Sequence, residues 1–150
     1  MKVYFDSSIL VKLYYPEPES AQVEAFVKQH RVIIPFTYFH NLEINNAIQL
    51  KEYREEITAT EKTGIINAIH EDKQKGILQQ LTVSYHRVFE ESLKLSADHT
   101  SDIGARTLDI IHVATALCGE FSHFLSHDGG QNSLAEKAGL SIVELPPHRA

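Results

Sequence analysis

Short apolar runs of strand length alternate with helical segments along the chain. The runs lie at residues 2–5, 32–34, 121–126 and 140–145, and a further short strand is predicted at 81–83. Between them, apolar residues recur three and four positions apart, which is the spacing of an amphipathic helix. Because strands that alternate with helices build parallel sheets covered on both faces, we predict an α/β fold with three α/β/α layers around a central parallel sheet.

Local start and stop signals refine the helix boundaries. Residues 58–61, Thr-Ala-Thr-Glu, have the form of a capping box, and Gly76 is placed to end the helix that they open. Pro35 is expected to close the second strand, and residues 99–102 and 127–130 are expected to be loops. The predicted helices cover residues 9–13, 20–30, 37–54, 58–76, 86–97, 106–117 and 132–138.

The length and the composition of the chain fit one soluble domain. A chain of 150 residues is of common domain size, and we expect a single domain over residues 1–150. No segment reaches the roughly 18 apolar residues that cross a membrane, and the first residues leave no room for a signal peptide. We therefore expect a cytoplasmic protein without membrane contact. The single cysteine, Cys118, lies in an apolar helix and is expected to be a small core residue.

The formal net charge of −6 argues against a protein that binds nucleic acid by phosphate neutralisation alone. It does not exclude a nuclease that holds its metal with carboxylates, because bound cations reverse the sign of such a site. Contact with a nucleic acid is then expected from a small basic subset, Lys12, Arg54 and Arg106.

Four acidic residues stand in apolar or strand-end settings. Asp109 lies near the start of the most apolar helix, where a buried charge needs a partner. Asp6 directly follows the first strand and Asp128 follows the fourth, at the edge of a parallel sheet where ligands bind. Glu43 lies within the apolar set of the third predicted helix.

Crowded carboxylates repel one another, and a divalent cation removes that repulsion. All-oxygen ligation without a nearby cysteine favours a hard ion, Mg²⁺ or Mn²⁺. Such ions activate water and stabilise charge on a phosphoryl oxygen, so the natural substrate is a phosphodiester. We predict that the four acids are metal ligands and catalytic residues.

Each acid also has an ordinary structural interpretation. Asp6 suits a helix cap, and Glu43 suits a solvated helix position. Asp109 could be held by Arg106 as its ion partner, and Asp128 could be a plain turn residue. The metal site is favoured because four such positions coincide.

Other polar residues are predicted to support the acids. Ser8 and Ser126 each lie two residues from a strand-end aspartate and could bond a carboxylate, a metal-bound water or a phosphate, although each also suits a turn. Asn46 follows the helix glutamate by one short turn and could orient it. None of the nine histidines has the spacing of a zinc site. His112 is either a hydrogen-bonded core residue or a neighbour of the site.

Four segments, residues 3–11, 43–47, 106–114 and 124–128, carry these acids in one order along nearly the whole chain. In that order they resemble the PIN-domain family, and within it the VapC-like toxin ribonucleases of toxin–antitoxin pairs. The resemblance implies a PIN-like fold, a Mg²⁺ or Mn²⁺ site formed by the four acids, and endonucleolytic cleavage of RNA. It also implies a homodimer silenced by an antitoxin protein. The chain departs from the pattern after Asp128, where Gly129-Gly130 replace a basic or bulky polar residue.

Other classes fit the sequence less well. A haloacid-dehalogenase-type phosphatase needs a second aspartate where Ser8 stands, and a receiver domain needs an early acidic pair and a late lysine. Glycine fingerprints for nucleotide binding are absent from the sequence. The alternative that stays open is a non-catalytic PIN-like module that binds RNA or a protein partner.

Overall fold

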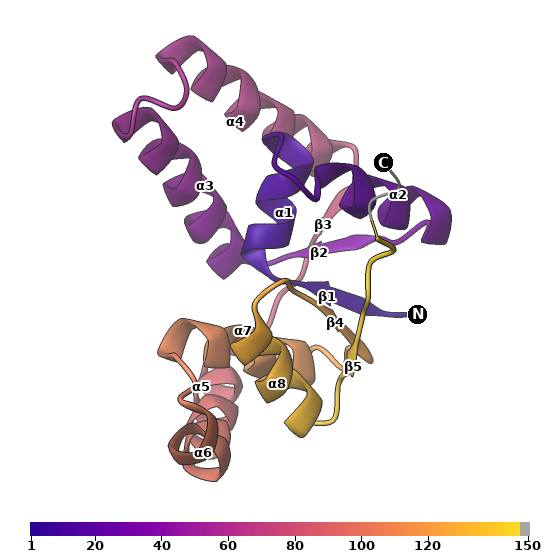
Figure 1. The fold of residues 1–150 in the computed structure, drawn as a ribbon, viewed down its shortest axis with the longest axis vertical. Helices are drawn as coiled ribbons and strands as arrows, with labels where there is room; N and C mark the ends of the chain where they lie inside the picture. The colour runs from indigo at the N-terminus through magenta and orange to yellow at the C-terminus, as the bar shows by residue number, and fades with distance from the viewer. Residues whose placement is uncertain (148–150) are drawn as a thin grey trace. The chain divides into compact units, whose positions relative to one another are not determined.

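The computed structural model describes residues 1–147, which form two compact units. The first unit combines residues 1–6 with residues 81–144, and the second begins at Ser7, runs to Gln80 and also takes in the chain from Leu145. Figure 1 follows the chain through its elements. Within the described part of the chain, no helix is both long and apolar enough to cross a membrane.

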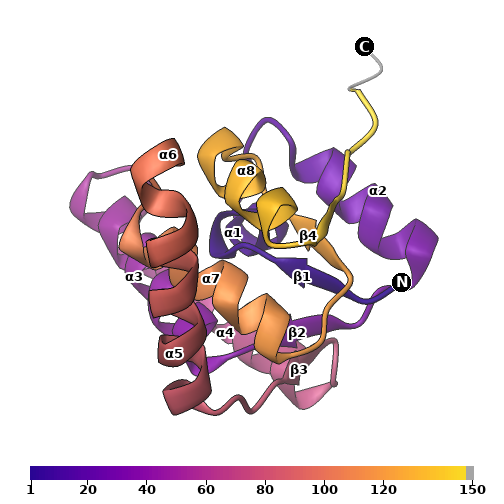
Figure 2. The ribbon, with the colours of Figure 1, turned by 90° about the horizontal axis from the view of Figure 1, so that it is seen from below.

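The first unit is built on a three-stranded parallel sheet in the order β1-β4-β5. Its strands are β1 (Val3–Phe5), β4 (His123–Leu125) and β5 (Ser141–Ile142). Its helical elements are α5 (Tyr85–Leu95), the π-helical turn η1 (Ser96–Thr100), α6 (Ser101–Ile103), α7 (Thr107–Cys118) and α8 (Gly129–Lys137). Figure 2 shows α7 and α8 close to β1 and β4.

The core of the first unit joins the sheet to α5, α7 and α8. Tyr4 and Phe124 are register partners, and their rings stack with centroids 5.6 Å apart. Val113 on α7 and Leu134 on α8 are fully buried in the same cluster. Burying such side chains contributes about 1.5–3 kcal/mol each. The apolar character of α7 therefore reflects its place in the core.

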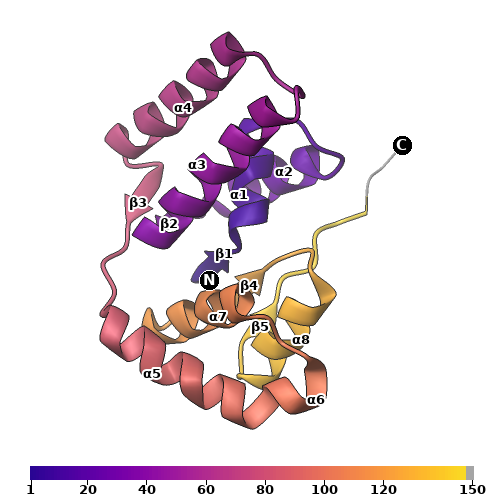
Figure 3. The same cartoon turned by 90° about the vertical axis from the view of Figure 1, so that its left-hand side faces the viewer.

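The second unit is mostly helical. Its helices are α1 (Ser7–Tyr14), α2 (Ser20–His30), α3 (Tyr38–Tyr53) and α4 (Ala59–Gln74), and its strands are β2 (Ile34–Phe36) and β3 (Leu78–Gln80). Strands β2 and β3 pair in parallel. Figure 3 shows α3 and α4 side by side. Phenol Oη of Tyr14 donates to Asp72 Oδ2 at 2.7 Å and ties α1 to α4.

Several sequence predictions are confirmed. The strands are parallel, and the helices predicted at residues 20–30, 37–54, 58–76 and 106–117 are present within a residue or two at each end. The predicted capping box forms, because Thr58 Oγ1 accepts from Glu61 N–H while the Glu61 carboxylate accepts from Thr58 N–H. Cys118 ends α7 and packs against the core.

Other boundaries differ from the predictions. Pro35 lies inside β2 rather than after it; β2 pairs only with β3 among the described strands, and a strand edge tolerates a residue without N–H. Strand β3 lies three residues before the predicted 81–83, because its pairing involves the backbone of a segment with mostly exposed side chains. The predicted loop at 99–102 is helical and ends at Gly104, whose φ of 66° is left-handed.

The described strands pair as two separate sheets instead of the one central sheet that was predicted. The α/β class with parallel strands is confirmed. The three-layer arrangement and the single domain stay predictions.

Candidate functional site

Asp6 and Ser126 lie at the carboxyl edge of the three-stranded sheet. Phe5 and Leu125 are register partners, so the residues that follow them leave the sheet side by side. The backbone N–H of Asp6 donates to the carbonyl oxygen of Leu125 at 3.0 Å, and this bond holds the two chain segments together just beyond the strands. Both Asp6 and Ser126 are buried. The prediction that a strand-end aspartate occupies this edge is confirmed for Asp6.

His112 on α7 links Asp6 to the core. Its Nε2 lies 3.5 Å from Asp6 Oδ1, and its Nδ1 lies 2.7 Å from the Tyr4 phenol oxygen. If the phenol donates to Nδ1, the neutral imidazole carries its proton on Nε2, facing the carboxylate. The two interpretations offered for His112 thus hold together: it is a hydrogen-bonded core residue, and it is a neighbour of Asp6.

Asp109 lies in the first turn of α7 and keeps 19% of its side chain exposed. Its Oδ2 accepts from Nε of Arg106 at 2.8 Å. A carboxylate in the first helical turn is also favoured by the helix dipole. The partner that the sequence required for this charge is thus Arg106, as the ordinary interpretation proposed.

Asp128 caps α8. Its Oδ1 accepts from Gln131 N–H at 2.8 Å, and its own N–H donates to Ser126 Oγ at 3.0 Å. Its Oδ2 accepts from Nη2 of Arg106 at 3.0 Å. Helix α8 therefore begins at Gly129. The predicted loop at 127–130 is shorter than expected, because the Asp128 carboxylate accepts a backbone N–H of the first helical turn.

The guanidinium of Arg106 joins two of the predicted acids and interacts with a third. Hydrogen bonding to Asp109 is the largest cause that raises the pKa of Arg106, followed by the charges of Asp109, Asp128 and Asp6. Two carboxylates of the first unit thus share one exposed cationic group, and the negative charge of a third, Asp6, also favours that cation.

The donor chemistry of this cluster fits a hard divalent ion. Three carboxylates supply oxygen ligands only, and Arg106 already stands in as their positive partner. Across residues 1–147, however, no three His, Cys, Asp or Glu side chains are already placed to hold a metal ion together. Asp6, Asp109 and Asp128 could form such a site only after their side chains rearrange.

The remaining predicted residues belong to the second unit. Glu43 is half-buried on α3, Asn46 is exposed one turn further along, and Ser8 is exposed on α1. Their predicted roles beside the aspartates stay predictions. Lys12 Nζ lies 2.8 Å from Glu17 Oε2 and 3.0 Å from Glu19 Oε2, and 11% of the Lys12 side chain is exposed. Its contact with a nucleic acid also stays a prediction.

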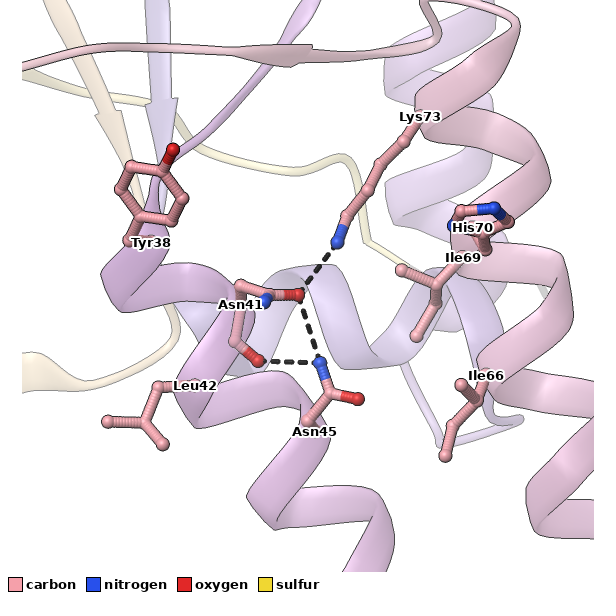
Figure 4. A pocket seen from close by; sticks show the side chains of 8 residues that line it. All are labelled: Tyr38, Asn41, Leu42, Asn45, Ile66, Ile69, His70 and Lys73. Carbon is pink, nitrogen blue, oxygen red and sulfur yellow. Dashed lines mark hydrogen bonds between the residues drawn. The ribbon is translucent and has the colours of Figure 1, made fainter.

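The second unit has a pocket of its own between α3 and α4, with a volume of about 390 Å³. Figure 4 shows its polar wall, where Lys73 Nζ donates to Asn41 Oδ1 at 2.7 Å and Asn45 Nδ2 donates to the same oxygen at 3.0 Å. Ile66 and Ile69 form the facing apolar wall. Partial burial lowers the pKa of the Lys73 ammonium. Nothing in the sequence pattern had singled out this pocket.

Sequence reasoning also missed two members of the first-unit site. Tyr4 was interpreted as a strand residue only, although a phenol buried in a strand needs a hydrogen-bond partner. Gln131 is 1% exposed directly behind the Asp128 cap. Its helix had been predicted to start at residue 132, three residues after the observed start, so the one-turn relation of Gln131 to Asp128 was not visible.

The fold and the site define an α/β protein with an acidic cluster at the carboxyl edge of a parallel sheet. No protein-family model matches the sequence, and no curated protein matches it significantly. Two solved structures are similar in fold. FitAcB from Neisseria gonorrhoeae matches with a TM-score of 0.62 and 14% identity over 95% of this chain and 96% of that chain. VapBC2 from Rickettsia felis, bound to a DNA fragment from their promoter, matches with a TM-score of 0.69 and 9% identity over 97% and 100%.

These comparisons correct the family assignment made from the sequence. The predicted membership of the PIN-domain family, as a VapC-like toxin ribonuclease, would require a family match, and none is found. The similar structures are complexes, so the likeness does not single out a toxin chain. At 14% and 9% identity the likeness establishes the fold alone.

Proposed function

We propose that the chain is a metal-dependent endoribonuclease that acts as one component of a toxin–antitoxin pair. The observation that carries the proposal is the pairing of Asp109 and Asp128 with a single cation, Arg106, in the unit whose sheet edge also holds the buried Asp6. Open α/β sheets bind ligands at this edge. RNA is the proposed substrate, and an antitoxin protein and a second copy of the chain are the proposed partners in the cytoplasm.

Asp6, Asp109 and Asp128 would hold Mg²⁺ or Mn²⁺, and Glu43 is the fourth ligand predicted from the sequence. When bound, the ion supplies an activated water and stabilises negative charge on a phosphoryl oxygen. The other residues position these groups. His112 faces Asp6 from the core, and Ser126 accepts the Asp128 N–H and so fixes the backbone beneath that carboxylate.

The likeness to FitAcB and VapBC2 supports the pairing with a second protein, since both are complexes of toxin–antitoxin systems. VapBC2 is itself bound to a DNA fragment from their promoter. For this chain, whose net charge is −6, a nucleic acid would have to be gripped locally. Arg54 and Arg106 are exposed and suited to that contact, whereas Lys12 is held by two glutamates.

A second candidate function is a non-catalytic module that binds RNA or a protein. It is favoured by one observation: among the described residues, no three potential ligands are already arranged for a metal. Binding of RNA without cleavage, at any concentration of Mg²⁺ or Mn²⁺, would support this candidate over the nuclease.

The test is RNA cleavage by the purified protein with Mg²⁺, with Mn²⁺ and with a chelator. We expect cleavage only with an ion, and Asp6→Asn and Asp109→Asn should each lower it by more than about 100-fold, since even indirect supports of a metal site cost 10–100-fold. Asp102→Asn, an exposed aspartate of the first unit, is the matched control and should cleave normally. Glu43→Gln tests the acid in the second unit. Equal cleavage in chelator would refute the metal mechanism.

A further inference from the structure

Arg106 bridges two carboxylates with neighbouring nitrogens of one guanidinium. Nε donates to Asp109 Oδ2 at 2.8 Å, and Nη2 donates to Asp128 Oδ2 at 3.0 Å. The guanidinium is planar and rigid, so it holds both oxygens on one edge of a single small cation. The Arg106 side chain is 71% exposed, whereas those of Asp109 and Asp128 are 19% and 41% exposed.

The backbone explains why this side chain reaches both acids. Arg106 is the residue before α7, with extended φ and ψ of −89° and 149°, and its side chain makes no capping bond. Asp109 is in the following turn, and Asp128 occupies the equivalent position before α8. The starts of the two helices therefore present their carboxylates to the same cation.

A divalent ion held by Asp109 and Asp128 would share these two carboxylates with Arg106. Mg²⁺ binds carboxylate oxygen at about 2.0–2.1 Å and demands near-octahedral geometry, so both carboxylates must be free to turn toward the ion. The two cations also repel each other. Binding of the ion to Asp109 and Asp128 and the two contacts of Arg106 therefore oppose each other.

We propose that Arg106 is an internal counter-ion of the carboxylate site, which competes with the divalent ion and is displaced from Asp109 and Asp128 when the ion binds. This inference rests on the proposed metal-dependent function. Arg106 is a positioning residue in this role: it keeps the two carboxylates together and sets the metal concentration at which the site fills.

The first measurement is calorimetric titration of Mn²⁺ into the intact protein and into Arg106→Gln. We expect Arg106→Gln to bind Mn²⁺ about 2- to 30-fold more tightly, the range that loss of two exposed ion pairs spans. Arg87→Gln removes the same charge from an exposed position of α5 and should bind Mn²⁺ like the unchanged protein. Arg106→Lys keeps the positive charge but lacks the planar guanidinium that reaches both carboxylates. Its Mn²⁺ affinity should lie between those of the unchanged protein and Arg106→Gln.

The second measurement follows Arg106 itself. In a ¹⁵N NMR spectrum, the Nε–H signal that disappears in Arg106→Gln identifies this side chain. Addition of Mg²⁺ should move that signal toward those of exposed arginines, with the same half-saturation as binding. In Asp109→Asn, the signal should already be shifted before Mg²⁺ is added.

The outcomes separate this inference from the proposed function. Equal or weaker Mn²⁺ binding by Arg106→Gln, or an unmoved Arg106 signal at saturating Mg²⁺, overturns the competition and leaves the metal site standing. Absence of Mn²⁺ binding in both the unchanged protein and Arg106→Gln overturns the metal site and the inference together. Circular dichroism confirms that each variant is folded.

Discussion

His112 Nε2 lies 3.5 Å from Asp6 Oδ1, and both side chains are almost fully buried. The Tyr4 phenol, at 2.7 Å from Nδ1, sits on the other side of the same imidazole. A hydrogen bond to one ring nitrogen decides which tautomer a neutral histidine adopts. Tyr4 therefore influences the Asp6 carboxylate although it belongs to the core.

Tyr4→Phe tests this effect of Tyr4 on Asp6 through His112. The ring packing against Phe121 and Phe124 is retained, while the bond to His112 is lost. We expect the free energy of unfolding to fall by about 0.5–1.5 kcal/mol, the usual net value of one hydrogen bond. Metal-supported RNA cleavage should fall more than the folded fraction does, because His112 is no longer held. Denaturant unfolding and cleavage rates measure the two effects, and Tyr53→Phe, an exposed tyrosine, is the control.

The sequence predicts the acids of the first unit well because strand ends and apolar helices are visible as patterns. Asp6 follows β1 as expected, and Asp109 lies in the first turn of the apolar α7. The contacts of Arg106 with both Asp109 and Asp128 depend on how α7 and α8 start side by side, and no local pattern encodes that distance. Glu43 shows the other limit, since its helix was predicted correctly while its partners are set by tertiary packing.

The short strands show a similar limit. Strand β3 buries Leu78 and exposes Gln79 and Gln80, so its hydrophobic pattern is weak and the more apolar residues 81–83 were chosen in its place. Pairing with β2 is a backbone property, and side-chain periodicity carries little information about it. Helices α3 and α4 were easier because their apolar residues recur at helical spacing, and α4 also opens with a local capping box.

Asp128 has two roles that a pair of substitutions separates. Its Oδ1 caps α8, and its Oδ2 contacts Arg106. Asp128→Asn keeps a capping oxygen and removes the charge, so stability should hold while metal affinity falls. Asp128→Ala removes both and should also lose about 1 kcal/mol of unfolding free energy. Urea unfolding and Mn²⁺ titration of both variants check this; equal stability losses would show that the cap contributes little.

Gln131 is buried behind that cap with both side-chain polar atoms unpaired. Within the described residues, neither its Oε1 nor its Nε2 has a hydrogen-bond partner. Replacing such a group by an apolar one of similar shape avoids its desolvation cost. We expect Gln131→Met to raise the free energy of unfolding by about 1 kcal/mol. Gln29→Met, at an exposed position of α2, controls for helix propensity. A loss of stability in Gln131→Met would indicate that buried water satisfies the amide.

Cys118 at the end of α7 gives a prediction about pH. Burial raises the pKa of its thiol, the charge of Arg87 lowers it, and that of Glu91 raises it. A raised pKa means less thiolate at a given pH, so iodoacetamide should alkylate Cys118 more slowly at pH 8 than it alkylates a small unburied thiol. The rate should keep rising above the pH where an ordinary thiol levels off.

Arg87→Gln provides the matched test of this electrostatic account. Removing the cation takes away the contribution that lowers the Cys118 pKa, so alkylation at pH 8 should become slower than in the unchanged protein. In urea the two proteins should react at the same rate, because the folded environment is gone. Cys118 is the only cysteine of the chain, so mass spectrometry follows the reaction without ambiguity. Faster alkylation of folded Arg87→Gln would mean that exposure of the thiol, and not its pKa, controls the rate.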